Sequence, residues 1–270
     1  MRYLSGRANL ACTIFVPWDC NNNCPFCTSK HMYKEMSDNF DLEEIIHKII
    51  LLNKNKFISE FVLTGGEPLS NLDNLKRLVN AMEKKVFINT TLPIMDNIDE
   101  VIEYINSEPK IQGINISRHL NYKFDSPTST DDKINLIQKP IRINTVIPNN
   151  LNVEKLFLFI ERYGNEKQMI NLREDYRYIT TTTLKDRNEM VDLLSNYFDY
   201  AGTNTCMVCN SEFFIAPNCI VCYHRGLEHS SYQLKDKCYV NDILITPNGK
   251  IYKDWNFSEE DLEFNKWLFN

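Results

Sequence analysis

Six short segments of apolar and β-branched residues alternate along the chain with six stretches whose apolar residues recur at helical spacing. The strand-like segments are residues 12–16, 61–64, 86–89, 113–117, 141–147 and 169–172. The helix-like stretches are residues 42–52, 72–84, 98–105, 132–138, 153–163 and 185–200. Six successive β-then-α units predict a parallel sheet with right-handed crossovers, either a partial (β/α)6 barrel or a doubly wound sheet. In both folds the functional loops follow the carboxyl ends of the strands.

The pattern changes after about Gly202. Residues 203–270 hold five of the nine cysteines and two hairpin-like stretches, residues 212–222 and 242–255. The second hairpin contains Asn248-Gly249, a strong signal for a two-residue turn, and residues 259–269 predict a short helix. We therefore predict an α/β fold with a partial-barrel core over residues 1–200. A small C-terminal cysteine-rich β-hairpin domain is predicted over residues 201–270.

The composition excludes several classes of protein. Thirty Lys and Arg against thirty-six Asp and Glu give a net charge of −6, which provides no field to attract nucleic acid or an anionic membrane. No apolar run approaches the roughly 18–20 residues of a membrane span, and the first residues lack the apolar core of a signal peptide. We expect a cytoplasmic protein. In that reducing compartment, nine cysteines indicate metal binding or redox catalysis rather than disulfides.

The first cysteine group follows the first predicted strand. Cys20, Cys24 and Cys27 form a C-x3-C-x2-C loop. Three thiolates can hold three irons of an iron–sulfur cube and leave the fourth iron open to a substrate or cofactor. A structural zinc site, which normally has four protein ligands, and three buried thiols are the alternatives.

A glycine motif, Thr64-Gly65-Gly66-Glu67-Pro68, ends the second predicted strand. Paired glycines allow the backbone to approach a ligand closely, and Glu67 is able to accept a hydrogen bond from a cationic amine. Alone this motif is weak evidence. It gains weight because the neighbouring strand carries the cysteine loop at the same edge of the sheet.

The sequence resembles the radical S-adenosylmethionine (SAM) superfamily. The resemblance rests on Cys20, Cys24 and Cys27 with Phe26 before the third cysteine, and on Gly65-Gly66-Glu67-Pro68. It implies a [4Fe–4S] cluster whose open iron binds the amino and carboxylate groups of SAM, with the glycine motif holding the amine. It also implies a flavodoxin- or ferredoxin-type electron donor, because one electron cleaves SAM to methionine and a 5′-deoxyadenosyl radical. That radical abstracts a hydrogen atom from the substrate.

The same resemblance implies further polar contacts to SAM. Ser117 ends the fourth strand, Asn144 lies on the fifth, and Thr90 and Thr91 end the third. A Ser or Asn at a strand end is also a common turn or cap residue. Arg118 and His119 follow Ser117 and are candidates for a carboxylate clamp or an acid/base pair. No residue is assigned as the catalytic acid or base.

The second cysteine group has two interpretations. Two CxxC pairs, Cys206 with Cys209 and Cys219 with Cys222, have the spacing of a zinc ribbon. Alternatively, Cys206, Cys209 and Cys222 resemble the auxiliary [4Fe–4S] segment of the molybdenum-cofactor GTP cyclase and SPASM/twitch branch. In that case Cys219 or Cys238 is a candidate for the fourth ligand.

The segment after Cys209-Asn210 argues against GTP as the substrate. That branch carries phosphate-binding arginines there, whereas this chain has Ser211-Glu212-Phe213-Phe214. We expect a substrate without a triphosphate, with an apolar or aromatic part and a cationic group for Glu212. Because Phe213 and Phe214 alternate across a strand, only one of them faces the site and the other belongs to the core.

The sequence therefore predicts a radical SAM enzyme that acts on a small-molecule or peptide substrate and holds a second metal centre in its C-terminal domain. The alternative is a zinc-stapled RNA- or peptide-binding module that keeps the barrel as a scaffold. The acidic charge balance and the intact cysteine loop favour the enzyme.

Overall fold

The computed structural model describes residues 2–6, 10–18, 20, 22, 24–27, 39–120, 130–148, 151–175, 183–204, 211–224, 231–255 and 261–269. The chain divides into two compact units. The first contains Met1–Gly113 and His229–Asn270, and the second contains Ile114–Glu228. Strand β5 (Ile111–Ser117) spans the boundary between them. No helix in the described ranges has the length and hydrophobicity needed to span a lipid bilayer.

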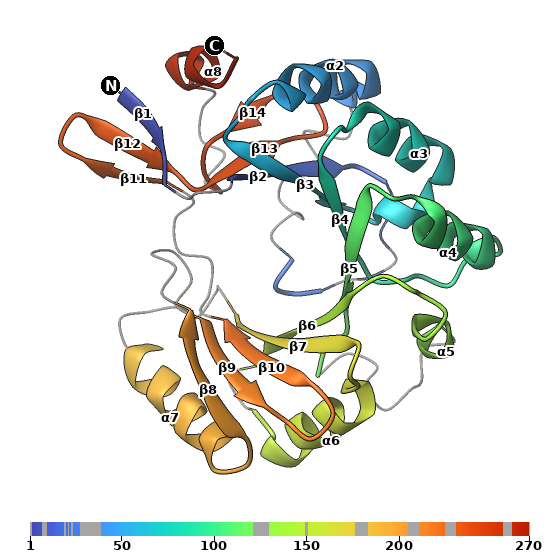
Figure 1. The fold of residues 1–270 in the computed structure, drawn as a ribbon, viewed down its shortest axis with the longest axis vertical. Helices are drawn as coiled ribbons and strands as arrows, with labels where there is room; N and C mark the ends of the chain where they lie inside the picture. The colour runs from blue at the N-terminus through green and yellow to red at the C-terminus, as the bar shows by residue number, and fades with distance from the viewer. Residues whose placement is uncertain are drawn as a thin grey trace. The chain divides into compact units, whose positions relative to one another are not determined.

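The first unit is built on a mostly parallel sheet. Its strands are β2 (Leu10–Val16), β3 (Ile58–Gly65), β4 (Lys85–Thr90), β13 (Asp242–Ile245) and β14 (Ile251–Tyr252). Strand β3 pairs in parallel with β2 and β4, β13 pairs in parallel with β2, and β14 is antiparallel to β13. Figure 1 shows α2 (Leu42–Asn53), α3 (Leu72–Ala81) and α4 (Ile98–Ser107) on the same side of β2, β3 and β4.

Hydrophobic burial explains these elements. Strand β2 is almost entirely buried, which is typical of a central parallel strand covered on both faces. Helix α2 buries Ile45, Ile49 and Leu52, three residues spaced along one face. Its start is fixed by Asp41, whose side chain accepts a hydrogen bond from the Glu44 backbone N at 3.0 Å. The sheet and its helices thus share one apolar core.

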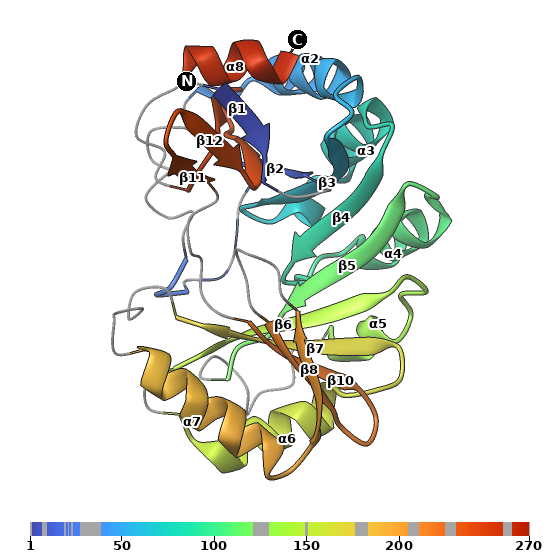
Figure 2. The ribbon, with the colours of Figure 1, turned by 60° about the vertical axis from the view of Figure 1, so that its left-hand side comes forward.

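A second, three-stranded sheet in the first unit joins the two ends of the chain. Strand β12 (Lys237–Val240) lies between β1 (Arg2–Ser5), with which it is parallel, and β11 (Ser231–Leu234), with which it is antiparallel. Figure 2 shows helix α8 (Leu262–Phe269) beside this sheet. Tyr3 packs edge-on against Phe264 with ring centroids 5.6 Å apart, and its hydroxyl donates to Asp261 at 2.5 Å. These contacts of Tyr3 therefore hold strand β1 and helix α8 together.

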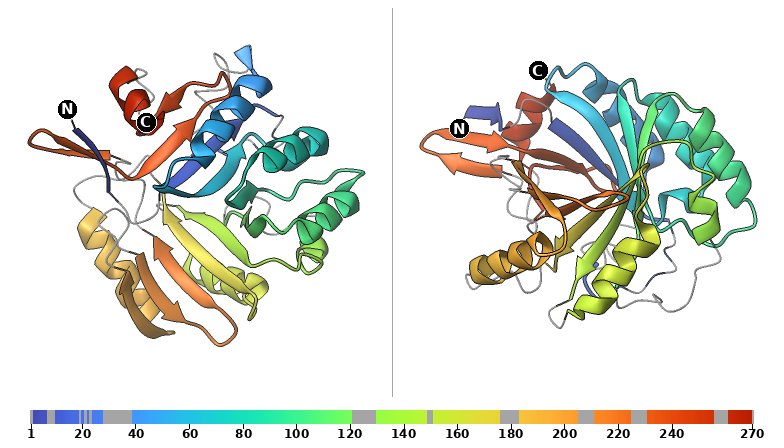
Figure 3. Two further views of the ribbon diagram at one scale, coloured as in Figure 1. Left: turned by 45° about the horizontal axis from the view of Figure 1, so that its top comes forward. Right: turned by 60° about the horizontal axis from the view of Figure 1, so that its bottom comes forward.

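The second unit extends the β/α pattern and ends in an antiparallel hairpin. Strands β6 (Ile141–Ile147) and β7 (Gln168–Glu174) are parallel, and β10 (Ile220–His224) is parallel to β7. Strands β9 (Ser211–Ile215) and β8 (Asp199–Asn204) continue the sheet as antiparallel neighbours. Helices α5 (Asp131–Ile134), α6 (Val153–Tyr163) and α7 (Thr183–Ser195) belong to this unit. Figure 3 draws α6 in yellow-green and α7 in gold.

The structure confirms the α/β class with a mostly parallel sheet. Each of the six predicted units contains a strand followed by a helix. Both predicted hairpins and the final helix are also present. The hairpins, however, do not pack as one appendage. Strand β10 pairs with β7 in the second unit, and β13 pairs with β2 in the first. Residues after 200 therefore contribute to both units, whereas the sequence predicts a boundary near residue 200.

Neighbouring residues on β9 give a matched test of this core. Phe214 is fully buried, whereas Ile215 is 56% exposed. Phe214→Ala should lower the free energy of unfolding by about 3–5 kcal/mol because it leaves a cavity. Ile215→Ala should change it by no more than about 0.5 kcal/mol. Urea unfolding of both variants measures the difference, and similar losses would contradict the assigned register of β9.

Candidate active site

The turn that ends β3 packs directly against the segment that follows β2. Gly65 has a φ angle of +117°, and a Cβ atom at this position would lie 2.3 Å from the Val16 carbonyl oxygen. A Cβ atom at Gly66 would lie 1.7 Å from the Trp18 carbonyl oxygen. Only glycine fits at either position. The backbone N of Gly66 donates to Val16 O at 2.8 Å, and the backbone N of Glu67 donates to Trp18 O at 3.1 Å. These bonds fix the glycine turn against the segment that precedes Cys20.

The carboxylate of Glu67 is held by four hydrogen bonds from its own chain. Oε1 accepts from the Leu69 backbone N at 3.1 Å and from Thr90 Oγ1 at 2.5 Å. Oε2 accepts from the backbone N and from Oγ1 of Thr91, both at 2.7 Å. A carboxylate offers about four acceptor positions, so the protein's own donors fill this one.

This arrangement shows a structural role for Glu67, and its contact with an amine stays a prediction. The side chain is only 2% exposed, and burial raises its pKa against the opposing effect of the hydrogen bonds from Thr90 and Thr91. Glu67 thus ties the end of β3 to the end of β4. The Thr91 hydroxyl, expected on SAM, donates to Glu67.

The cysteine loop follows this joined edge of the sheet. Cys20 is exposed, Cys24 and Cys27 are partly exposed, and the backbone N of Cys27 donates to Cys24 O at 3.2 Å. Phe26 is partly exposed beside them. Within the described ranges, no three His, Cys, Asp or Glu side chains are grouped so as to hold a metal ion. The loop thus presents three accessible thiols that are not gathered around a common point.

In the second unit, the structure brings Ser117 and Asn144 side by side. Ser117 is in register with Asn144, and Asn144 is in register with Asn171 on β7. Asn171 Nδ2 donates to Asn144 Oδ1 at 2.9 Å. The register continues through Cys222 on β10 to Phe213 on β9, so these five side chains share one face of the sheet. We call Ser117, Asn144, Asn171, Cys222 and Phe213 the polar row.

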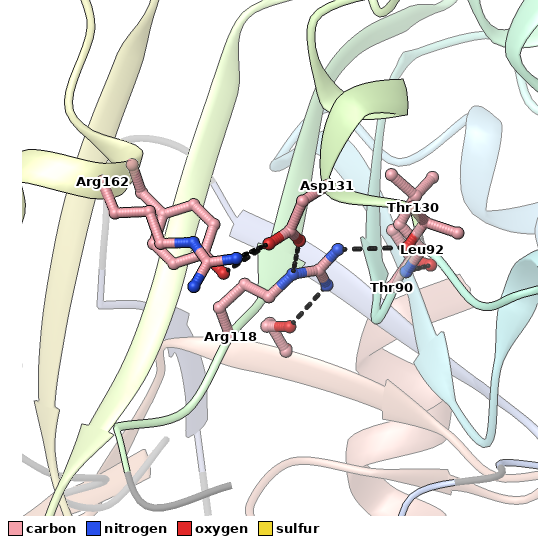
Figure 4. Close-up of polar contacts among 8 residues, drawn as sticks. Thr90, Leu92, Arg118, Thr130, Asp131 and Arg162 are labelled. Carbon is pink, nitrogen blue, oxygen red and sulfur yellow. Dashed lines mark hydrogen bonds and ion pairs between the residues drawn. The ribbon is translucent and has the colours of Figure 1, made fainter. Parts of the chain in front are cut away.

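Arg118 takes part in a hydrogen-bonded network with Asp131, and His119 is buried next to it. Arg118 Nε donates to Asp131 Oδ1 at 2.8 Å, and Asp131 Oδ2 also accepts from Arg162 and from the Tyr163 hydroxyl, as Figure 4 shows in part. This network holds the start of α5 against α6. Burial and the charge of Arg118 lower the pKa of His119 to about 4, so its imidazole is neutral near pH 7.

The described cysteines of the second group have different surroundings. Cys206 and Cys209 fall outside the described residues. Cys219 lies against the end of α6, because a Cβ atom at Gly164 would be 2.9 Å from its sulfur. Cys222 belongs to the polar row on the opposite face of the sheet. Cys238 lies on β12 in register with Tyr3, in the other unit. The pairing of Cys219 with Cys222 that a zinc ribbon needs is therefore absent from the described part of the chain.

Glu212 is also turned away from the polar row. Its Oε2 accepts hydrogen bonds from the Tyr200 hydroxyl at 2.7 Å and from Thr203 Oγ1 at 2.5 Å. Glu212 precedes Phe213 on β9 and so lies on the opposite face. Tyr200 and Thr203 thus occupy one oxygen of Glu212, and its contact with a cationic group of the substrate stays a prediction. The alternation predicted for the two phenylalanines is confirmed, because Phe214 is buried and Phe213 lies in the polar row.

Residues 19–147 match the family model of the radical SAM superfamily. This match covers just under half of the chain. The crystal structure of Streptococcus suis SuiB matches with a TM-score of 0.51 and 17% identity, over 70% of this chain and 47% of that chain. The crystal structure of SuiB bound to the precursor peptide SuiA gives 0.50 and 19%, over 70% and 46%. No curated protein matches the sequence.

The chain thus spans about half the length of these SuiB structures, and at this identity the likeness establishes a shared fold. The radical SAM domain and this fold together support an enzyme of the superfamily. The superfamily implies a [4Fe–4S] cluster and SAM. The donor chemistry fits, because Cys20, Cys24 and Cys27 are accessible thiols. In contrast, Cys12 of β2 is fully buried and burial raises its pKa.

Sequence reasoning missed two features of the strand ends described above. The Trp18 carbonyl oxygen accepts a hydrogen bond from the Glu67 backbone N. Because this is a main-chain contact, no side chain in the sequence indicates it. Asn171 does have one, since it is a polar residue inside the otherwise apolar segment 169–172. Buried polar groups inside a strand require a partner, and that requirement would have pointed to Asn144.

Replacing Glu67 with glutamine tests its positioning role. The amide nitrogen of Glu67→Gln cannot accept the hydrogen bonds that one carboxylate oxygen now receives. The free energy of unfolding should fall by about 1–3 kcal/mol. Glu60→Gln, a partly exposed position on the same strand, is the control and should remain within about 0.5 kcal/mol. Equal losses in urea unfolding would show that the four bonds to Glu67 do not stabilise this edge.

Proposed function

We propose that this chain reductively cleaves SAM at a [4Fe–4S] cluster and abstracts a hydrogen atom from a small-molecule or peptide substrate. The observation that carries the proposal is the hydrogen-bonded contact between the glycine turn at the end of β3 and residues 16–18 at the end of β2. Because the cysteine loop starts two residues later, the cluster ligands and the glycine turn share the carboxyl edge of adjacent parallel strands. Ligand sites of α/β sheets form at this edge.

Individual residues take distinct roles in this proposal. Cys20, Cys24 and Cys27 hold the cluster, and Phe26 shields it. Gly65 and Gly66 let the backbone approach the methionine part of SAM, while Glu67 and Thr91 position that backbone. Bound together, the cluster and SAM supply a 5′-deoxyadenosyl radical once an electron arrives from a flavodoxin- or ferredoxin-type donor. Ser117 and Asn144 are the proposed polar contacts to SAM.

A second metal centre is part of the proposal. Cys206, Cys209 and Cys222 are its ligands, as an auxiliary [4Fe–4S] cluster. The opposite directions of Cys219 and Cys222 favour this three-cysteine set over a four-thiolate zinc ribbon. The same difference in direction weakens the alternative of a binding module that is held together by zinc. Cys238 on β12 stays a candidate for the fourth ligand.

The substrate is proposed only as a class. One matched structure is described as SuiB bound to a precursor peptide, which supports a peptide as one of the two options. The differences from the GTP cyclase branch after Cys209 support a substrate without a triphosphate.

Anaerobically reconstituted protein should convert SAM to 5′-deoxyadenosine when a strong reductant is present. Replacing Cys20, Cys24 and Cys27 together by Ala should abolish this product, since these thiolates are the cluster's protein ligands. Chromatography of the quenched reaction measures it. Wild-type protein that binds iron but forms no 5′-deoxyadenosine with any reductant would contradict the proposal.

Iron content tests the second centre. Each [4Fe–4S] site holds about four irons, so the triple variant should retain about half of the wild-type iron. Cys222→Ala should likewise lose about half, whereas Cys219→Ala, the matched control on the same hairpin, should lose none. One equivalent of zinc, with iron near zero in the triple variant, would establish the zinc alternative.

A further inference from the structure

Leu92, the second residue after β4, has a left-handed backbone with a φ angle of +48°. This conformation is unfavourable for a residue with a Cβ atom, which approaches the following carbonyl oxygen too closely. Leu92 also precedes Pro93, and the residue before a proline prefers an extended backbone. The chain therefore holds a strained residue just beyond the carboxyl end of β4.

Among the described residues, one other non-glycine residue has a positive φ angle, and its cause is local. Lys235, with a φ angle of +56°, lies in the two-residue turn between β11 and β12, where Leu234 is in register with Lys237. The common two-residue hairpin turns require positive φ angles. Leu92 lies between β4 and helix α4, so this explanation does not apply to it.

Two kinds of contact hold Leu92 in its conformation. Its backbone N donates to Thr90 Oγ1 at 2.8 Å, and the same hydroxyl donates to Glu67 Oε1 at 2.5 Å. Its side chain is only 1% exposed, so apolar burial fixes it on the other side. A strained residue persists only where its surroundings determine its conformation in this way.

The same hydrogen bonds connect Leu92 to the glycine turn. Glu67, which accepts from Thr90 and Thr91, follows Gly66 directly and donates its backbone N to the Trp18 carbonyl oxygen. Movement at Leu92 would therefore reach the turn through two successive hydrogen bonds. Strained residues cluster at ligand sites, where a fixed backbone preorganises the contacts.

We propose that Leu92 is a positioning residue for SAM binding. Its buried side chain holds the left-handed backbone, which keeps the Thr90 hydroxyl between the Leu92 backbone N and Glu67. The inference rests on the proposed function, in which Glu67 and Thr91 position the glycine turn that contacts SAM. A rigid turn binds more tightly because less conformational freedom is lost on binding.

Anaerobic calorimetry of reconstituted protein, without reductant, measures SAM binding in variants of Leu92. Leu92→Ala keeps the Cβ atom that disfavours the conformation but removes the side chain that holds it. The dissociation constant for SAM should rise about tenfold or more, as expected when a strained conformation is lost. Leu92→Met has an apolar side chain of similar volume and should remain within about threefold of wild type.

A milder variant covers the case in which Leu92→Ala does not fold. Leu92→Val keeps most of the apolar side chain, but its branched Cβ atom makes a left-handed backbone still less favourable. It should weaken SAM binding in the same direction. Circular dichroism identifies the temperature at which each variant is folded, and the titrations are made below it.

Two controls separate this role from a general loss of stability. Leu78→Ala removes another fully buried leucine side chain, on α3, and should leave SAM binding within about twofold of wild type. Lys235→Gly relieves the other positive φ angle, at an exposed turn, and should also leave it within about twofold. The iron content of all variants should equal that of wild type, because the cysteine loop is unchanged.

Unchanged SAM binding in folded Leu92→Ala and Leu92→Val would overturn the inference. So would an equal weakening in Leu78→Ala, or a weakening in Leu92→Met as large as that in Leu92→Ala. Wild-type protein that holds iron but binds no SAM would instead refute the proposed function. Wild-type protein that binds SAM no more tightly than the Leu92 variants refutes the role of Leu92 alone.

Discussion

The buried carboxylate of Glu67 is the interaction on which the edge of the first unit's sheet depends. It joins the end of β3 to the end of β4 through Thr90 and Thr91, while its own backbone N binds the Trp18 carbonyl group beyond β2. Three parallel strand ends are thereby held at one edge. A buried carboxylate would be costly without partners, and here the protein supplies all of them. The cysteine loop consequently starts from a rigid support.

In the second unit, the alternation of side chains across the sheet separates two kinds of chemistry. The face with the polar row carries Asn, Cys and Arg side chains, whereas Glu174 and Glu212 turn to the other face and bond to tyrosines. A shift of one residue in β9 or β10 would exchange these faces. The buried Phe214 resists that shift because its ring would then leave the core.

The repeated strands and helices could be predicted because hydrophobic periodicity is a local property of the sequence. The cysteine loop and the glycine motif could also be recognised, because each is a run of contiguous residues. Strand pairing between distant parts of the chain could not be predicted. Strands β10 and β13 join β7 and β2 across large sequence distances, and no local pattern records those partners. For the same reason, the sequence did not reveal that Thr90 and Thr91, more than twenty residues away, fill the carboxylate of Glu67.

Two site interpretations depend on which face of a strand each residue occupies. Glu212 was considered from its place after Cys209-Asn210, and the pairing of Cys219 with Cys222 from its spacing. Once β9 and β10 are in register, alternation places Glu212 away from the polar row. The same contacts place Cys219 beside α6.

Electron paramagnetic resonance of the reduced, reconstituted protein tests the central claim most directly. If the cysteine loop holds a cluster with an open iron beside the glycine turn, adding SAM should change the cluster's spectrum. The change should be lost in Gly66→Ala, because the added Cβ meets the Trp18 carbonyl oxygen and displaces the turn. An identical spectrum with and without SAM in the wild-type protein would contradict the account.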